Sequence, residues 1–316
     1  MVMVTVVVPT HDHGATLRRS VASALAQTVR DLEVFIVGDG VPDAARPVIS
    51  DLVNQDSRIR FFDRPKGERH GERYRHEALA QARGRIVCYL GDDDLWLPDH
   101  VETMDRALHG ADLVHTLTMM VDPAGHMMAA VVDVTKPGFL EMLRRNHGSF
   151  GLSCGGHTLE AYRRLPHGWL PAPPQLNSDC NMWIQFLEQP WCRAASLMRP
   201  TVLKFPNPQR KAWPIARRLE ELDRYAERIE RPEGIASLRL ELLEALACER
   251  IHQLDEVRDQ LSNELAELER LRAERDRERK LLEQLQREVV ALHGSRSWRW
   301  TRPLRQLVRA LRRSSS

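Results

Sequence analysis

Short apolar runs alternate with helix-like segments through the first hundred residues of the chain. The runs are rich in β-branched and aromatic residues and end in turn residues, which predicts strands at 4–8, 32–40, 59–65 and 85–90. The intervening segments repeat apolar residues at helical spacing and predict helices that begin near Thr16, the expected first cap, and span 44–54 and 73–84. This alternation predicts an α/β fold with a mainly parallel sheet covered by helices on both faces.

The regular pattern weakens after residue 113. Residues 113–136 predict further strands, whereas 137–213 are rich in proline and tryptophan and include a long loop at 165–179. Long irregular loops in compact domains are often functional. Because the composition changes to leucine, glutamate and arginine from about residue 215, we assign residues 1–213 to the α/β domain and 214–249 to a helical connector.

A heptad pattern follows the connector and predicts a coiled coil over residues 250–292. One seam position holds Leu254, Leu261, Leu268, Leu282 and Val289, and the other holds Val257, Leu271, Leu285 and Leu292. Glu264, Arg275 and Glu278 interrupt the seam near its middle. The pattern favours a homodimer, and the alternative is a long helix that folds back on the domain.

The tail, residues 293–316, contains no acidic residue and predicts a basic amphipathic helix. Its apolar side chains, Leu304, Leu307, Val308 and Leu311, fall on one helical face, whereas its arginines lie elsewhere on the wheel. Two tryptophans, Trp298 and Trp300, precede this helix. This profile is typical of a segment that lies on an anionic membrane surface. The alternatives, a disordered basic end or a nucleic-acid contact, are weaker, since the apolar stripe would then have no purpose.

The composition is that of an ordinary protein with a packed core. The chain has 316 residues, of which 42% are hydrophobic and 28% charged, with a net charge of +2. Its five cysteines form no CxxC pair, which favours a reducing cytoplasm over a disulfide framework. No apolar stretch approaches the length of a membrane span, and Pro9 ends the short N-terminal run, so we predict a cytoplasmic protein that is at most peripheral at the inner face of the cell membrane.

Acidic residues follow two of the predicted strands. Asp39 comes directly after the second strand, and Asp92, Asp93 and Asp94 come directly after the fourth. The carboxyl ends of parallel strands are where ligands bind in such sheets. The triplet is therefore either a solvated turn or a site where Mn²⁺ or Mg²⁺ meets a substrate phosphate.

Two blocks of sequence resemble the family 2 glycosyltransferases of the GT-A fold. The first is VTVVVPTHDHGATLRRSVASALAQTVRDLEVFIVGDG, and the second is RYRHEALAQARGRIVCYLGDDDLWLPDH. The resemblance covers residues 4 to about 205 and implies inverting transfer of a sugar from a nucleotide-diphospho-sugar, assisted by Mn²⁺ or Mg²⁺. The tail SRSWRWTRPLRQLVRALRR after a coiled coil resembles the C-terminal ends of bacterial transferases that build cell-surface polysaccharides, which implies a glycan or lipid-linked acceptor.

The resemblance assigns roles to residues of both blocks. It implies that Asp93 binds the metal and that the donor nucleotide contacts Pro9, Thr10, His11, Asp39, Arg75 and Asp92. His11 and His13 flank Asp12 and suggest a metal site, but their place in the family block favours loop shaping or nucleotide contact. Two positions depart from the family pattern, since Gly38 and Gly91 stand where the family has acids.

The general base is expected in the segment NSDCNMWIQF. The family has an aspartate there, after a glutamate, so the resemblance implies that Asp179 is the base, with Ser178 in the glutamate position. His157 and Trp183 are candidates for the acceptor side, with structural roles as the alternatives. Gly38, Gly91 and Ser178 motivate a second hypothesis, a coiled-coil scaffold with a weakly active transferase-like domain. A third, a sugar-phosphate nucleotidyltransferase, would need a glycine-rich basic loop after the first strand, where this chain has PTHDHGATL.

Overall fold

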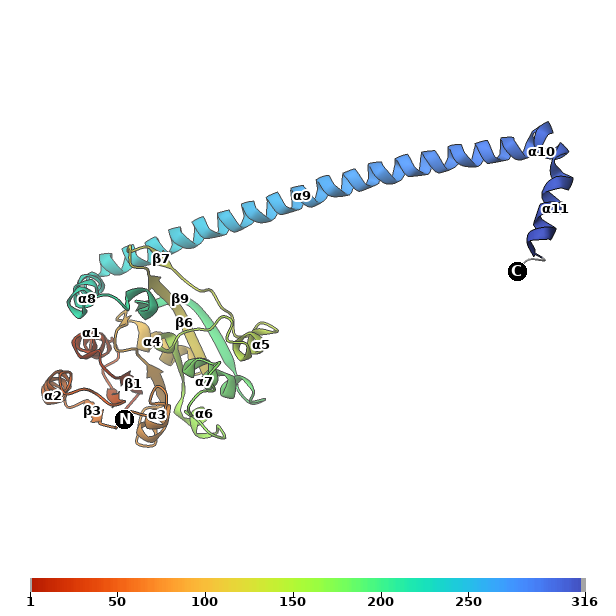
Figure 1. Ribbon diagram of the computed structural model, residues 1–316. Helices are drawn as coiled ribbons and strands as arrows, with labels where there is room; N and C mark the ends of the chain where they lie inside the picture. Colours follow the sequence, from red (N-terminus) through yellow and green to blue (C-terminus); the bar gives the residue numbers. More distant parts are fainter. Residues whose placement is uncertain (1, 314–316) are drawn as a thin grey trace. The chain divides into compact units, whose positions relative to one another are not determined.

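The chain forms two compact units. The computed structural model describes the backbone of residues 2–313 and the side chains as far as Leu307. The first unit runs to Ala247 and the second begins at Cys248. The boundary falls inside the longest helix, α9 (Pro232–Gly294), which Figure 1 shows as one continuous element.

The first unit is built on a mixed sheet of nine strands. The strands are β1 (Val4–Thr10), β2 (Leu32–Gly38), β3 (Ile59–Phe62), β4 (Ile86–Tyr89), β5 (Leu95–Trp96), β6 (Leu113–Val121), β7 (Met127–Met128), β8 (Gly155–Thr158) and β9 (Ala194–Lys204). Their order is β3-β2-β1-β4-β8-β6-β9-β5, with β7 paired to β6. Strands β3, β2, β1, β4, β6 and β9 share one direction, whereas β8, β5 and β7 run against it. The predicted α/β fold with a mostly parallel sheet is confirmed.

The sheet is covered on both faces. Every residue of β2 and β4 is buried, and since successive side chains of a strand point to opposite faces, both faces must carry other elements. The helices are α1 (Gly14–Leu25), α2 (Arg46–Gln55), α3 (Glu72–Leu79), α4 (His100–Ala107), α5 (Phe139–Arg144), α6 (Leu159–Arg163), α7 (Ser178–Leu187) and α8 (Ile215–Ile229). Helix α1 begins at Gly14, so the expectation that Thr16 caps it is wrong; the Thr16 hydroxyl lies within the first turn and donates to the carbonyl of His13.

Helix α8 and the start of α9 belong to the first unit. Leu222 and Tyr225 of α8 and Leu238 of α9 are buried in a second apolar cluster with Leu203 and Phe205 of the β9 region. The residues 214–247 of the predicted connector therefore pack with the α/β domain in one unit. This packing brings α8 against α1, beside the carboxyl ends of the central strands.

The second unit consists of the rest of α9, α10 (Arg296–Trp300) and α11 (Arg302–Arg313). The predicted seam residues of α9, from Leu254 to Leu292, are all exposed in the single chain. Trp300 and Leu304 are exposed as well, and the predicted apolar residues Val308 and Leu311 lie outside the described side chains. Among the described helices, none is both long and apolar enough to cross a membrane.

Candidate active site

The acidic residues meet at one edge of the sheet, as their positions after strands predicted. Strand β1 lies between β2 and β4, so Thr10 at its end stands between the two acidic loops. The Thr10 hydroxyl donates to Oδ2 of Asp92 at 2.6 Å, and the backbone N–H of Asp39 donates to the carbonyl of Thr10 at 2.9 Å. Pro9 precedes this contact on β1 and pairs with Val37 of β2.

Each acid of the triplet has its own basic neighbour. The imidazole Nδ1 of His13 lies 3.0 Å from Oδ1 of Asp92. The Arg218 guanidinium from α8 lies 2.7 Å from Oδ2 of Asp93. Asp94 is buried and lies 3.4 Å from Nζ of Lys204 on β9.

The crowded carboxylates perturb one another. Burial and the charges of Asp94 and Asp92 raise the pKa of Asp93 to about 7. The charge of Asp94 raises the pKa of Lys204, and the hydrogen bond to Asp92 raises the pKa of His13 against the opposing effects of burial and Arg218. Like charges this close disfavour ionisation, so the cluster gains from any cation that enters it.

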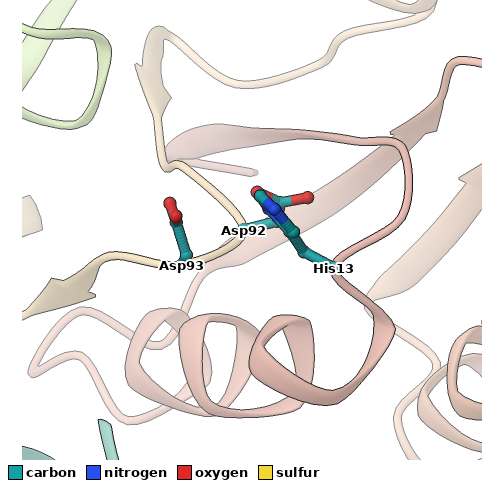
Figure 2. A group of neighbouring side chains, drawn as sticks. All are labelled: His13, Asp92 and Asp93. Atoms are coloured by element: carbon teal, nitrogen blue, oxygen red, sulfur yellow. The ribbon is translucent and has the colours of Figure 1, made fainter. Parts of the chain in front are cut away.

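A divalent cation fits the donor set of this cluster. His13, Asp92 and Asp93 each offer a ligand atom, and these atoms lie within 4.8 Å of one another. Figure 2 shows the three side chains, with His13 from the start of α1 and both aspartates from the loop after β4. Carboxylate oxygens suit Mg²⁺ and Mn²⁺, and an imidazole nitrogen is a common further ligand of transition metals. The residues that would hold a metal are therefore Asp93, Asp92 and His13.

The loop after β3 covers Asp39. The two carboxylate oxygens of Asp39 contact Nζ of Lys66 and the backbone N–H of Gly67. The ammonium group of Lys66 is thereby held against Asp39. His11 lies beside the same turn, with Nδ1 at 2.7 Å from the carbonyl oxygen of Asp39, so it contributes to the loop rather than to the acidic cluster.

Arg75 on α3 is a buried guanidinium with few partners. Its side chain packs over the ring of Trp169 at 4.6 Å and donates to the carbonyl of His70 at 2.6 Å. Its Nε has no hydrogen-bond partner within the described chain. A buried cation without a carboxylate partner is costly, which marks this position as suited to an anionic ligand.

Asp179 lies in the first turn of α7. The helix begins after Asn177, so Asp179 is not the cap, and its Oδ1 accepts the backbone N–H of Cys180 at 2.9 Å. Burial raises the pKa of Asp179, and the charges of Lys204 and Arg75 act against that shift. Lys204 also feels the charges of Asp93 and Asp94, so Asp179 and the acidic cluster face the same lysine.

The departures from the family pattern at Gly91 and Ser178 have local compensation. Gly91 donates its N–H to Oγ of Ser153 at 2.9 Å, and a Cβ at this position would lie 2.9 Å from Oδ2 of Asp94, so the space of a longer side chain is already filled. Ser178 donates to Glu72, a buried acid of α3, so a carboxylate lies beside the position where the family carries glutamate.

His157 and Trp183 lie in the core and not on an open surface. Both are fully buried, and His157 Nε2 contacts the hydroxyl of Tyr89 at 2.7 Å. Burial lowers the pKa of His157 to about 4, so its imidazole stays neutral. We therefore assign neither residue to acceptor contact, and the structural alternatives account for both.

Known proteins match the part of the chain that carries the acidic triplet. The family model "Glycosyl transferase family 2" matches residues 5–156. The chain is 33% identical over 130 residues to a chondroitin synthase of Pasteurella multocida, covering 40% of this chain and 13% of that protein. It is 30% identical over 111 residues to a GalNAc(5)-diNAcBac-PP-undecaprenol beta-1,3-glucosyltransferase of Campylobacter jejuni, covering 35% of this chain and 36% of that protein. The chain thus spans little more than a third, or less, of these relatives.

Solved structures support the fold. The structure of S. aureus TarS 1-349 in complex with UDP-GlcNAc superposes with a TM-score of 0.51 at 14% identity, over 65% of this chain and 58% of that chain. This likeness concerns the fold alone. Residues 5–156 therefore match glycosyl transferase family 2, and the first unit has the GT-A fold.

Proposed function

We propose that the chain is an inverting, metal-assisted glycosyltransferase that moves a sugar from a nucleotide-diphospho-sugar to a hydroxyl of a glycan or lipid-linked acceptor. The observation that carries the proposal is the placement of Lys204. Its Nζ lies 3.4 Å from Asp94, and the charges of Asp94, Asp93 and Asp179 all raise its pKa. A donor diphosphate at the acidic cluster and an attacking hydroxyl at Asp179 would thus lie near the same half-buried cation.

In this mechanism Asp179 is the general base. Its carboxylate accepts the proton of the acceptor hydroxyl as that oxygen bonds to the anomeric carbon, while the bond from this carbon to the diphosphate breaks. Attack opposite the leaving diphosphate inverts the anomeric configuration. The pKa of Asp179 is raised by burial, and a more basic carboxylate removes the proton more readily.

The donor would be held by the sheet edge and its loops. We assign nucleotide contact to Pro9, Thr10, His11 and Asp39. Asp39 would give up its contacts with Lys66 and Gly67 and contact the nucleotide base instead when the donor binds.

The diphosphate end is assigned to the buried basic residues. Arg75 has an unpartnered Nε and would contact the diphosphate side. A Mn²⁺ or Mg²⁺ ion held by His13, Asp92 and Asp93 would supply positive charge for the departing nucleoside diphosphate.

The second unit would bring the enzyme to its acceptor. We propose that residues 250–292 dimerise through the exposed seam and that the tail binds the anionic inner face of the cell membrane. Support comes from the exposed leucines of α9 and from the exposed Trp300 and Leu304 beside basic residues. The Campylobacter jejuni relative is named for an undecaprenol-linked acceptor, which favours a lipid-linked acceptor here and a role in cell-surface polysaccharide synthesis.

A panel of nucleotide sugars tests the proposal. The full chain would be offered each donor with and without Mn²⁺ or Mg²⁺ and a panel of simple acceptors, and donor hydrolysis would be followed as a second readout. Asp93→Asn is expected to abolish metal-dependent nucleotide binding, whereas Asp179→Asn is expected to abolish turnover while the nucleotide still binds.

Three other results would contradict the proposal. Retention at the anomeric centre, read by NMR of the product, would refute the inverting mechanism. Binding of no nucleotide diphosphate would favour the scaffold hypothesis that Gly38, Gly91 and Ser178 motivate. Release of pyrophosphate from a nucleoside triphosphate would favour a nucleotidyltransferase.

A further inference from the structure

Arg218 contacts two of the atoms that a metal would bind. Its NH2 group lies 2.7 Å from Oδ2 of Asp93, and its NH1 group lies 3.2 Å from Nε2 of His13. Nδ1 of His13 faces a carboxylate oxygen of Asp92, which can only accept, so Nδ1 carries the proton in this arrangement. The lone pair on Nε2 is therefore the one that a metal would take, and Arg218 is its present donor.

A guanidinium and a divalent cation exclude each other at these atoms. Arginine stays charged at any ordinary pH, so Arg218 cannot give up its place by losing a proton and must move. Its side chain is 9% exposed, which means that it leaves a largely desolvated position and needs a new partner. The repulsion from an incoming divalent cation would push it away from both Asp93 and His13.

The side chain can move without its helix. C-terminal to Arg218, α8 is fixed by the buried Leu222 and by the ion pairs of Glu221 with Arg210 and of Asp223 with Arg19. These contacts hold the backbone of α8 against the domain. Movement is therefore confined to the flexible arginine side chain at the edge of the cluster.

We propose that Arg218 is a further donor-binding residue, which fills the metal position in the free enzyme and transfers to the diphosphate when metal and donor bind. This inference rests on the proposed function. A planar guanidinium pairs well with phosphate oxygens, and a diphosphate bound at the metal would lie within its reach. Metal alone then binds weakly, because it must leave Arg218 unpaired, whereas metal and nucleotide strengthen each other's binding.

The first part of the proposal is that Arg218 fills the metal position in the free enzyme. Direct Mn²⁺ titration of the full chain, by electron paramagnetic resonance of the free ion, tests it. We expect Arg218→Met and Arg218→Gln to bind Mn²⁺ roughly tenfold more tightly than the wild type without nucleotide, since the ion no longer breaks a charge-assisted hydrogen bond. Arg217→Met is the matched control, because Arg217 lies on the same helix, packs over Trp213, and causes the same loss of charge. Near-UV circular dichroism would verify that every variant is folded.

Equal or weaker Mn²⁺ binding by both Arg218 variants would overturn the inference, and so would a matching gain in Arg217→Met.

The second part of the proposal is that Arg218 transfers to the diphosphate. To test it, the nucleoside diphosphate selected by the donor panel would be added. It is expected to raise Mn²⁺ affinity more in the wild type than in Arg218→Met, and an equal gain would refute the transfer to the diphosphate. If no protein binds Mn²⁺ but the nucleotide still binds, the Arg218 inference fails while donor binding stands; if neither binds, the proposed function fails with it.

Discussion

Replacing Glu221 with glutamine is expected to destabilise the first unit strongly. Glu221 and Arg210 form a bidentate ion pair, with Nε to Oε2 at 2.6 Å and NH2 to Oε1 at 2.7 Å. The Arg210 and Glu221 side chains are only 1% and 5% exposed. Arg210 also donates to the carbonyls of Val121 and Asp122, so the pair joins α8 to the end of β6. The substitution keeps the shape of the side chain and removes its charge.

The expected loss of unfolding free energy follows from the charge that Arg210 would keep without its counter-charge. Removing one partner of a buried ion pair costs about 3–5 kcal/mol, because the remaining ion stays desolvated without its counter-charge. Arg210 keeps two backbone acceptors and the amide oxygen of the new glutamine, which places Glu221→Gln near the lower end of this range. For a unit of this size, 1 kcal/mol corresponds to roughly 2–4 °C in Tm, so we expect Tm to fall by roughly 6–12 °C.

Urea unfolding followed by near-UV circular dichroism measures this cost. Glu102→Gln is the matched control, because Glu102 pairs with Arg106 across one exposed helical turn and such pairs contribute about 0.3–0.5 kcal/mol. The double variant Arg210→Met/Glu221→Leu removes both charges and is expected to recover most of the lost stability. If Glu221→Gln costs no more than Glu102→Gln, the buried pair does not anchor α8.

Three further predictions concern the site and the second unit. Asp179→Asn should lower kcat by roughly 10²–10⁴-fold, and in the wild type kcat/KM should fall as the pH drops through the pKa of Asp179, which burial raises above the ordinary aspartate value; an unchanged acidic limb in the variant would exclude Asp179 as the base. Leu268→Lys should convert the proposed dimer to a monomer in analytical ultracentrifugation, whereas Glu269→Lys on the outer face should not. Deleting 293–316 should remove co-sedimentation with anionic vesicles, and equal binding by the truncated chain would exclude the tail as the anchor.

The central strands were predictable, because their side chains carry the signal. Runs such as 4–8 and 85–90 are apolar on both faces, as a doubly covered parallel sheet requires. Strand β8 was not predicted, since Gly155 and Gly156 have no strand propensity. These glycines are placed by tertiary packing: a Cβ on Gly155 would lie 2.7 Å from Cζ2 of Trp183. The sequence pattern around β8 does not show this constraint, because it is imposed by Trp183 of α7.

The site was predictable only where its residues follow strands. The proximity of the two acidic loops could be predicted from the sequence, because parallel strands place their carboxyl ends at the same edge of the sheet. His13 was named for a different role, and no local signal marks Arg218, which lies 125 residues from Asp93 in the chain. Its position depends on the packing of α8 against α1 and on a buried ion pair, and both are consequences of the complete fold.

The departures from the family pattern show how a site can keep its chemistry while its residues change. Read alone, Gly91 and Ser178 suggest lost carboxylates and a weakened enzyme. In the folded chain, Ser153 and Asp94 fill the space beside Gly91, and Glu72 brings a carboxylate to Ser178 from another helix. What catalysis requires is a charge at a place in space, and the fold can supply it from any segment that reaches that place. A missing motif residue is therefore weak evidence against activity until the side chains around its position are known.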